Sequence, residues 1–208
     1  MKLYVTPSSP YGRVARIVVN EKGLGDRVEV LTAQTRVAGS PYYRINPSGR
    51  VPFLLRGDGV GMEDSGLIAA YLDALDGNPT LDHPRSFDNW DYGRLEACAR
   101  SHLDGLAVLV RELRRPENER SPAILSHELD RSRRIADHWE REIEHPIMQG
   151  PINMPQVVLV SAVLLREHFP SIDLLAARPR LSRWAARLIE RPSVGATMMK
   201  RDAARPVG

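Results

Sequence analysis

The chain has 208 residues, 42% of them hydrophobic and 26% charged, which suits one large or two small soluble domains. The formal net charge is only +3, and the basic residues alternate with acids, as in RRPENER (114–120), a pattern typical of solvated helix faces and not of nucleic-acid binding. A single cysteine, the lack of an apolar leader, and apolar runs far below the roughly 20 residues of a membrane span favour a cytoplasmic protein.

A short strand and a helix open the chain. KLYV, residues 2–5, predicts the strand. Ser9 and Pro10 then predict a helix start, because serine is a favoured N-cap and proline fits the first helical position. Apolar positions follow at helical spacing as far as Val18. Ser9 therefore lies at a strand-to-helix turn, where its hydroxyl either caps the helix alone or also acts beside the positive end of the helix dipole.

Further strands and helices complete an α/β unit over residues 1–76. RVEVL (27–31) alternates like a half-buried strand, and a helical turn is expected between Ser40-Pro41 and Asn46-Pro47. VPFLL (51–55) and VGM (60–62) flank a Gly-Asp-Gly turn and predict a hairpin. A helix starts at Asp64. The order β-α-β-(α)-β-β-α is that of a unit of thioredoxin size.

Residues 77–84 predict a linker, and residues 85–208 predict an all-helical domain. Helices are expected over about 87–113, from Ser121 onward, over 157–165 and over 180–190. VVLVSAVLL (157–165) is apolar on all sides and predicts a buried central helix, capped by Asn153 with Gln156 reaching back to the cap's amide. Other expected packing residues are Trp90, Trp139, Trp184 and Cys98.

The segment NPSGRVPFLL (46–55) is the most specific in the chain. Proline is the one residue that adopts a cis peptide at little cost. A cis Val51-Pro52 bond would leave the backbone of Val51 ready to pair with an extended peptide, and Arg50 could hold a carboxylate. The alternative is an ordinary edge-strand proline after an Asn-Pro-Ser-Gly turn.

Asp64 and Ser65 place a carboxylate, a hydroxyl and free backbone amides at the start of a helix. Such a helix end suits the carboxylate of a ligand, and Asp64 can pair with an ammonium group. The alternative is that both residues only cap the helix.

Three segments, the turn at Ser9, residues 46–55 and the Asp64-Ser65 pair, come in this order and are followed by helices. In this arrangement the chain resembles the glutathione transferase family over essentially its whole length. The resemblance implies a thioredoxin-like domain plus a helical domain, paired as a homodimer. It also implies that Asp64 and Ser65 grip the γ-glutamyl group of glutathione, that the backbone at Val51, before Pro52, pairs with the cysteinyl part, and that Arg50 meets the glycyl carboxylate. The acid of the pair is usually Glu in the family, and Asp64 is one methylene shorter, a difference expected to weaken glutathione binding without changing the role of the pair.

The same resemblance makes Ser9 the hydroxyl that activates the glutathione thiol, with Ser8 as the second candidate and Tyr11 as a residue that lines the pocket. It implies a transferase that joins glutathione, its co-substrate, to a small hydrophobic electrophile bound by the helical domain. Two alternatives stay open: a non-enzymatic glutathione-binding or protein-interaction member of the fold, and a thiol-disulfide reductase, which Ser9 in place of cysteine disfavours. The six histidines lack the spacing of a metal site, so no metal is expected.

Overall fold

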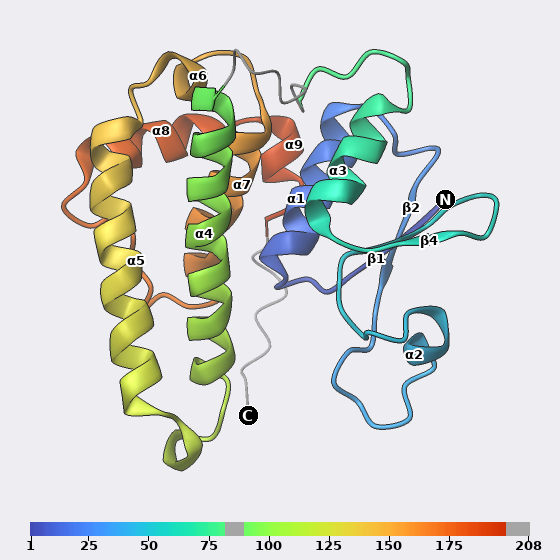
Figure 1. Ribbon diagram of the computed structural model, residues 1–208, viewed down its shortest axis with the longest axis horizontal. Coiled ribbons are helices and arrows are strands. Elements are labelled where there is room, and N and C mark those ends of the chain that lie inside the picture. The colour runs from blue at the N-terminus through green and yellow to red at the C-terminus, as the bar shows by residue number, and fades with distance from the viewer. Residues whose placement is uncertain (82–89, 199–208) are drawn as a thin grey trace.

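The computed structural model describes residues 1–81 and 90–198, which form an α/β part and a helical part side by side (Figure 1). In chain order the α/β part contains β1 (Lys2–Val5), α1 (Pro10–Glu21), β2 (Glu29–Thr32), α2 (Tyr42–Ile45), β3 (Phe53–Leu55), β4 (Gly61–Met62) and α3 (Ser65–Ala74). The helical part contains α4 (Trp90–Leu113), α5 (Pro122–Glu142), α6 (Pro146–Gln149), α7 (Met154–Val163), α8 (Pro179–Ile189) and α9 (Pro192–Gly195), with short 3-10 helices at Glu117–Glu119 and Leu164–Glu167. The predicted fold class, a thioredoxin-like unit followed by a helical bundle, is confirmed.

The sheet of the described residues has the strand order β2-β1-β3-β4, with β1 and β2 parallel and the other neighbours antiparallel. Side chains alternate between the two faces of a strand. Leu3 and Leu54 therefore lie in the main core with α1 and α3, whereas Tyr4 and Phe53 lie on the other face, where they pack with Tyr42 of α2. The helices thus cover both faces of the sheet, and they leave the loops at its edge free to form a site.

Three strands differ from their predicted form. β2 is mostly exposed instead of half-buried, because it forms one edge of the sheet. β3 begins at Phe53 and not at Val51, which fits the lack of an N–H on Pro52 for a strand ladder. β4 is likewise shorter than predicted, at Gly61–Met62.

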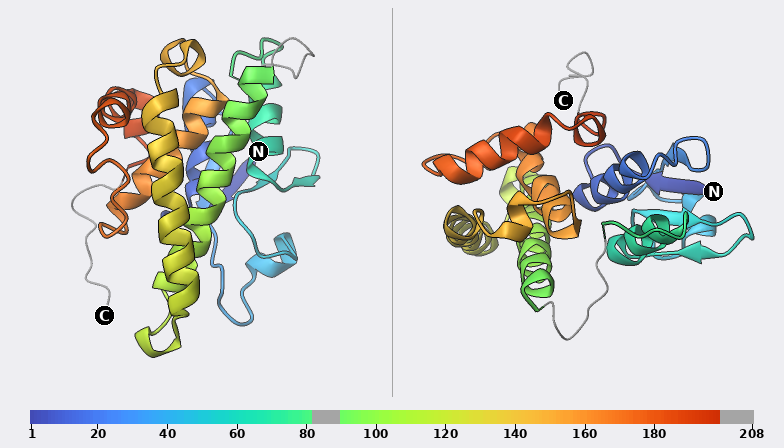
Figure 2. Two further views of the ribbon diagram at one scale, coloured as in Figure 1. Left: turned by 60° about the vertical axis from the view of Figure 1, so that its left-hand side comes forward. Right: turned by 90° about the horizontal axis from the view of Figure 1, so that it is seen from above.

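The helical part is built around α7. Figure 2 shows α4 and α5 lying antiparallel, and α7 packs against both α4 and α1. Every residue of α7 is buried, as predicted. Its cap is only half as predicted: Asn153 Oδ1 accepts from the backbone N–H of Gln156 at 3.1 Å, but the Gln156 side chain donates to the carbonyls of Ile147 and Gly150.

The prediction of a packing residue is wrong at one position. Trp90 is 72% exposed, because it lies about 200° around α4 from Tyr92, the first buried position of that helix. Trp139 and Trp184 are buried, and Cys98 packs half-buried against the core, as predicted. Residues 82–84 of the predicted linker and residues 87–89 of the predicted helix lie outside the described residues.

Contacts along α1 join the two parts. The guanidinium of buried Arg13 lies 2.6 Å from the carboxylate of Glu167, and Glu21 pairs with Arg191 at 2.9 Å. These contacts hold both ends of α1 against the helical part. Within residues 1–81 and 90–198, no helix combines the length and the apolarity that crossing a membrane requires.

Candidate functional site

A cleft of about 1430 Å³ lies between the two parts. Its walls come from the start of α1, the loop before β3, the start of α3 and the C-terminal half of α4. All the site residues predicted from the sequence line it: Ser8, Ser9, Tyr11, Arg50, Val51, Pro52, Asp64 and Ser65. The cleft brings together three segments that are up to 57 residues apart in the chain, from Ser8 to Ser65.

Ser9 is the N-cap of α1. Its Oγ accepts from the backbone N–H of Gly12 at 3.1 Å, so the capping prediction is correct. The hydroxyl proton is not used by that bond and stays free to be donated into the cleft. The N–H of Tyr11 is one of the amides at a helix start that have no partner within the helix. The turn therefore offers two donors and the positive end of a 12-residue helix to an anion.

Ser8 is held from the other side of the cleft. Its Oγ accepts from Arg114 Nη2 of the segment after α4 at 2.6 Å. The guanidinium of Arg114 also stacks over the ring of Phe169, 5.3 Å from its centroid. Ser8 thus faces the helical part, whereas the Ser9 hydroxyl remains at the mouth of α1.

The loop before β3 presents its backbone to the cleft. The Val51-Pro52 bond is cis, as the sequence suggested. Asn46 is buried and braces the loop, because it donates to the carbonyl of Arg50 at 3.0 Å and accepts from the N–H of Ser48 at 3.1 Å. The ladder between β1 and β3 starts only at Phe53, so the N–H and C=O of Val51 lie outside it.

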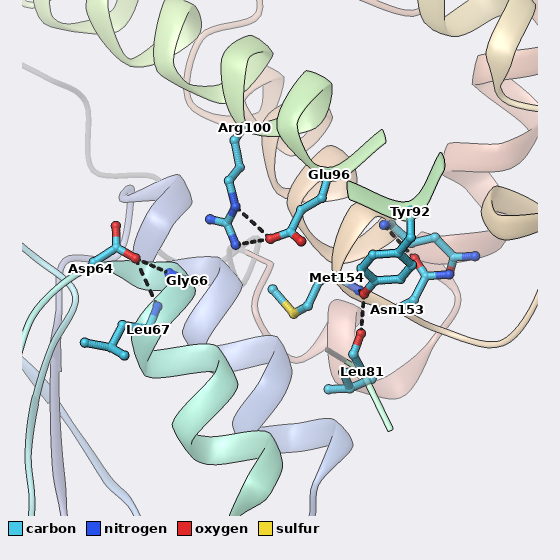
Figure 3. A network of polar contacts seen from close by, with 10 residues as sticks. Asp64, Gly66, Leu67, Leu81, Tyr92, Glu96, Arg100, Asn153 and Met154 are labelled. Carbon is cyan, nitrogen blue, oxygen red and sulfur yellow. Dashed lines mark hydrogen bonds and ion pairs between the residues drawn. The ribbon is translucent and has the colours of Figure 1, made fainter. Parts of the chain in front are cut away.

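Asp64 and Ser65 form the start of α3. One carboxylate oxygen of Asp64, Oδ1, accepts from the N–H groups of both Gly66 (2.8 Å) and Leu67 (3.0 Å), and Figure 3 shows the second oxygen pointing away from them. Asp64 has a φ of 71° and a ψ of 124°, which lies outside the left-handed helical region and is rare for any residue except glycine. Its capping role is confirmed, and its second oxygen accepts no hydrogen bond from the described residues. Ser65, which is buried, follows directly in the cleft wall.

Tyr11 does not point at either serine hydroxyl but donates to Asp104 of α4 at 2.5 Å. Burial and this hydrogen bond raise the pKa of Tyr11, an effect that Arg111 and Arg50 partly oppose. Tyr11 therefore stays protonated and serves as a link across the cleft.

Sequence reasoning missed the residues that α4 and the segment after it contribute to the site. Asp104, Val108, Arg111 and Arg115 recur at intervals of three or four and so share one face of the helix. The buried positions Leu103, Leu106, Leu109 and Val110 form the opposite stripe. In the sequence, the only signal for these site residues is this second stripe, which mixes charged and apolar side chains. No group of three or more His, Cys, Asp or Glu side chains in the described ranges is arranged to hold a metal ion.

Comparison with known proteins identifies the family. A family model described as glutathione S-transferase, N-terminal domain, matches residues 3–80. YibF of Escherichia coli K12, an uncharacterized GST-like protein, is 26% identical over 164 residues, which cover 78% of this chain and 80% of YibF. A glutathione transferase family member from Pseudomonas fluorescens Pf-5 with bound S-(propanoic acid)-glutathione is 26% identical, with a TM-score of 0.82 over 96% of this chain and 100% of that one. Residues 3–80 therefore match the glutathione S-transferase N-terminal domain, and the chain as a whole has the fold of glutathione transferase family members.

The same Pseudomonas protein with bound glutathione is 25% identical to the present chain. The match has a TM-score of 0.84 and covers 96% of this chain and 98% of that one. Ser9, Val51 and Asp64 all fall inside the matched residues 3–80. Asp104 and the arginines at the end of α4 fall outside them. The residues matched by the family model therefore form one wall of the cleft, and the helical part forms the opposite wall.

Proposed function

We propose that the protein is a glutathione transferase, which binds glutathione in the cleft and transfers its thiolate to an electrophilic carbon of a second substrate. The observation that carries the proposal is the convergence of Ser9, the backbone of Val51 and the Asp64-Ser65 pair in one cleft. Each of these groups has a hydrogen-bonding atom that the fold leaves unused, and together they suit the three parts of one peptide.

Glutathione is expected to lie along the α/β wall. Its γ-glutamyl ammonium pairs with the second oxygen of Asp64, and its α-carboxylate meets the start of α3 at Ser65. The cysteinyl backbone pairs with Val51 as an added strand would. Arg50, which lines the cleft from the same loop, is proposed to bind the glycyl carboxylate.

Ser9 is the proposed activating residue. A free thiol has a pKa near 8.5, so only a few per cent is thiolate at neutral pH. The Ser9 hydroxyl and the N-terminus of α1 both stabilise an anion at the cysteinyl sulfur. A lowering by two pKa units corresponds to about 2.7 kcal/mol, which is in the range of two such donors. Thiolate would then predominate at pH 7.

The electrophile is expected to bind against the helical wall. Ala107, Val108 and Leu165 form an apolar strip there, beside the mouth of α1. An electrophile with an apolar body fits this strip and places its reactive carbon over the sulfur.

We also propose the domain division and the assembly that the family resemblance implies. Residues 1–76 form the glutathione-binding domain, residues 77–84 the linker, and residues 85–208 the domain for the co-substrate. Two copies pair as a homodimer, with α3 close to the two-fold axis, and the protein is cytoplasmic.

Isothermal titration calorimetry with glutathione, followed by a turnover screen of aryl halides, enones and peroxides, tests the proposal. Binding of glutathione together with conjugation of at least one electrophile is the expected result. Binding without turnover would favour a non-enzymatic glutathione-binding protein. Absence of glutathione binding would overturn the proposal altogether.

A further inference from the structure

The helical wall of the cleft carries an unusual amount of positive charge for a hydrophobic substrate site. Arg111 in the last turn of α4 and Arg114 and Arg115 directly after it line the cleft. Arg36, from the loop after β2, lines the same cleft from the α/β part. Cations at the end of a helix are favoured by its dipole, but that effect does not account for Arg36.

Three of these guanidinium groups lack an anionic partner: Arg36, Arg111 and Arg114 form no ion pair with any residue in the described ranges. Arg115 differs, since it forms long ion pairs with Glu112 (3.9 Å) and Glu119 (3.8 Å). The rim of the cleft therefore holds several unneutralised cations close together.

The carboxylates of the cleft are already engaged elsewhere. Asp104 accepts the hydroxyl of Tyr11, and Glu112 accepts the N–H of Ser121 at the start of α5, at 2.5 Å. Asp64 accepts two backbone N–H groups of α3. Of these three acids, only Glu112 forms an ion pair with an arginine of the cleft, Arg115 at 3.9 Å, so the charges of Arg36, Arg111 and Arg114 are left for a ligand.

Arg114 is the best placed of the four. Its bond to Ser8 and its stacking on Phe169 hold the guanidinium in one orientation, beside the residue that precedes Ser9. Partial burial and the like charge of Arg36 both lower the pKa of Arg114. Two cations that face each other across a gap repel, and an anion between them would relieve that repulsion.

We propose that the electrophile carries an acidic group, a carboxylate or a similar anion, which Arg114, Arg111 and Arg36 bind while the thiolate attacks. This inference rests on the proposed transferase function and names the substrate class of that same site. A short acid is favoured, because Arg114 lies next to the expected position of the sulfur. With a halo acid, the sulfur forms a bond to the carbon that bears the halogen, and the halide leaves with the electron pair of the broken bond.

Calorimetry with a matched pair of ligands tests this directly. S-(carboxymethyl)glutathione and S-(carbamoylmethyl)glutathione differ only in a carboxylate against a neutral amide. In the wild type the acid is expected to bind at least tenfold more tightly than the amide. In Arg114→Gln and in Arg111→Gln this preference is expected to fall at least threefold, with glutathione affinity changed less than twofold. Arg111 forms no hydrogen bond or ion pair through its side chain with the residues that the structure describes. Arg111→Gln therefore tests the proposal even if Arg114→Gln is destabilised by the loss of its bond to Ser8. Arg134→Gln, an exposed arginine of α5 outside the cleft, is the control and should keep the full preference.

If the wild type binds glutathione but binds the two derivatives with equal affinity, the proposal of an acidic electrophile is overturned and the transferase proposal stands. If the arginine variants bind glutathione and both derivatives more weakly by the same factor, these arginines bind glutathione itself. This result would also overturn the proposal of an acidic electrophile. If the wild type bound neither glutathione nor its derivatives, the transferase function itself would fail.

Discussion

Asp64 has two separable roles in this account, and two substitutions tell them apart. Its Oδ1 caps α3 through the N–H groups of Gly66 and Leu67, and its other oxygen is proposed to pair with the ammonium group of glutathione. Asp64→Asn keeps an oxygen for the cap and nearly the same side-chain shape, but it loses the charge. Asp64→Ala loses both.

The loss of a hydrogen bond to a charged group costs about 1.5–3 kcal/mol, which corresponds to a rise of about 10- to 150-fold in the dissociation constant for glutathione. Both variants are expected to show this rise. Only Asp64→Ala also loses the cap, at about 1 kcal/mol, which lowers the melting temperature by about 2–4 °C in a chain of this size.

Calorimetry with glutathione and thermal unfolding without it measure the two effects separately. The reasoning would be refuted if Asp64→Asn bound glutathione within twofold of the wild type, since the residue would then be a helix cap alone. Ser65→Ala is a companion variant, and it too is expected to weaken glutathione binding more than it lowers stability.

Three further predictions concern stability, assembly and the link across the cleft. Burial, assisted by Arg131 and Arg178, lowers the pKa of His102 to about 3, and its two ring nitrogens have no hydrogen-bond partner among the described residues. Because the unfolded chain takes up this proton near pH 6.5 and the folded chain does not, stability should fall by about 1.4 kcal/mol per pH unit below 6.5. Denaturant unfolding at pH 7 and 5 should show the full loss in the wild type and in His127→Leu, and a clearly smaller loss in His102→Leu, where His168, whose pKa burial also lowers, still contributes; an equal loss in His102→Leu would disprove it. Light scattering should give twice the 23.3 kDa mass of one chain, and a monomer mass at all concentrations would contradict the dimer. Tyr11→Phe, which removes the bond to Asp104, should cost about 1 kcal/mol of stability and leave the pKa of bound glutathione unchanged; a shift in that pKa would show that Tyr11 acts on the thiol.

The parts of the fold that depend on neighbours in sequence were predictable. The Ser9 cap, the proline that follows it and the start of α3 at Asp64 are local signals, because a cap bonds to residues two or three positions away. The cis Val51-Pro52 bond was also suggested by the residue types and by the resemblance to a known family.

The helical wall of the site was not predictable in the same way. Tyr11 and Asp104 are 93 residues apart, and Ser8 and Arg114 are 106 apart, so no local spacing records either contact. Arg114 and Arg115 were interpreted as part of a solvated helix face, since the sequence does not reveal that the α/β part lies opposite them. Trp90 was predicted to be a packing residue for a related reason. It precedes the buried stripe of α4, and nothing in the neighbouring sequence indicates that its side chain is exposed.

The most direct test of the account is a titration of the glutathione thiolate bound to the protein, followed by its ultraviolet absorbance. In the wild type the pKa of the bound thiol is expected about two units below its value near 8.5 in a free thiol. Ser9→Ala should raise this pKa, with glutathione affinity nearly unchanged, and Ser8→Ala should leave it in place. A shift in Ser8→Ala alone would move the role to Ser8. A titration curve that is the same in the wild type and in Ser9→Ala would contradict the claim that the Ser9 hydroxyl activates the thiol.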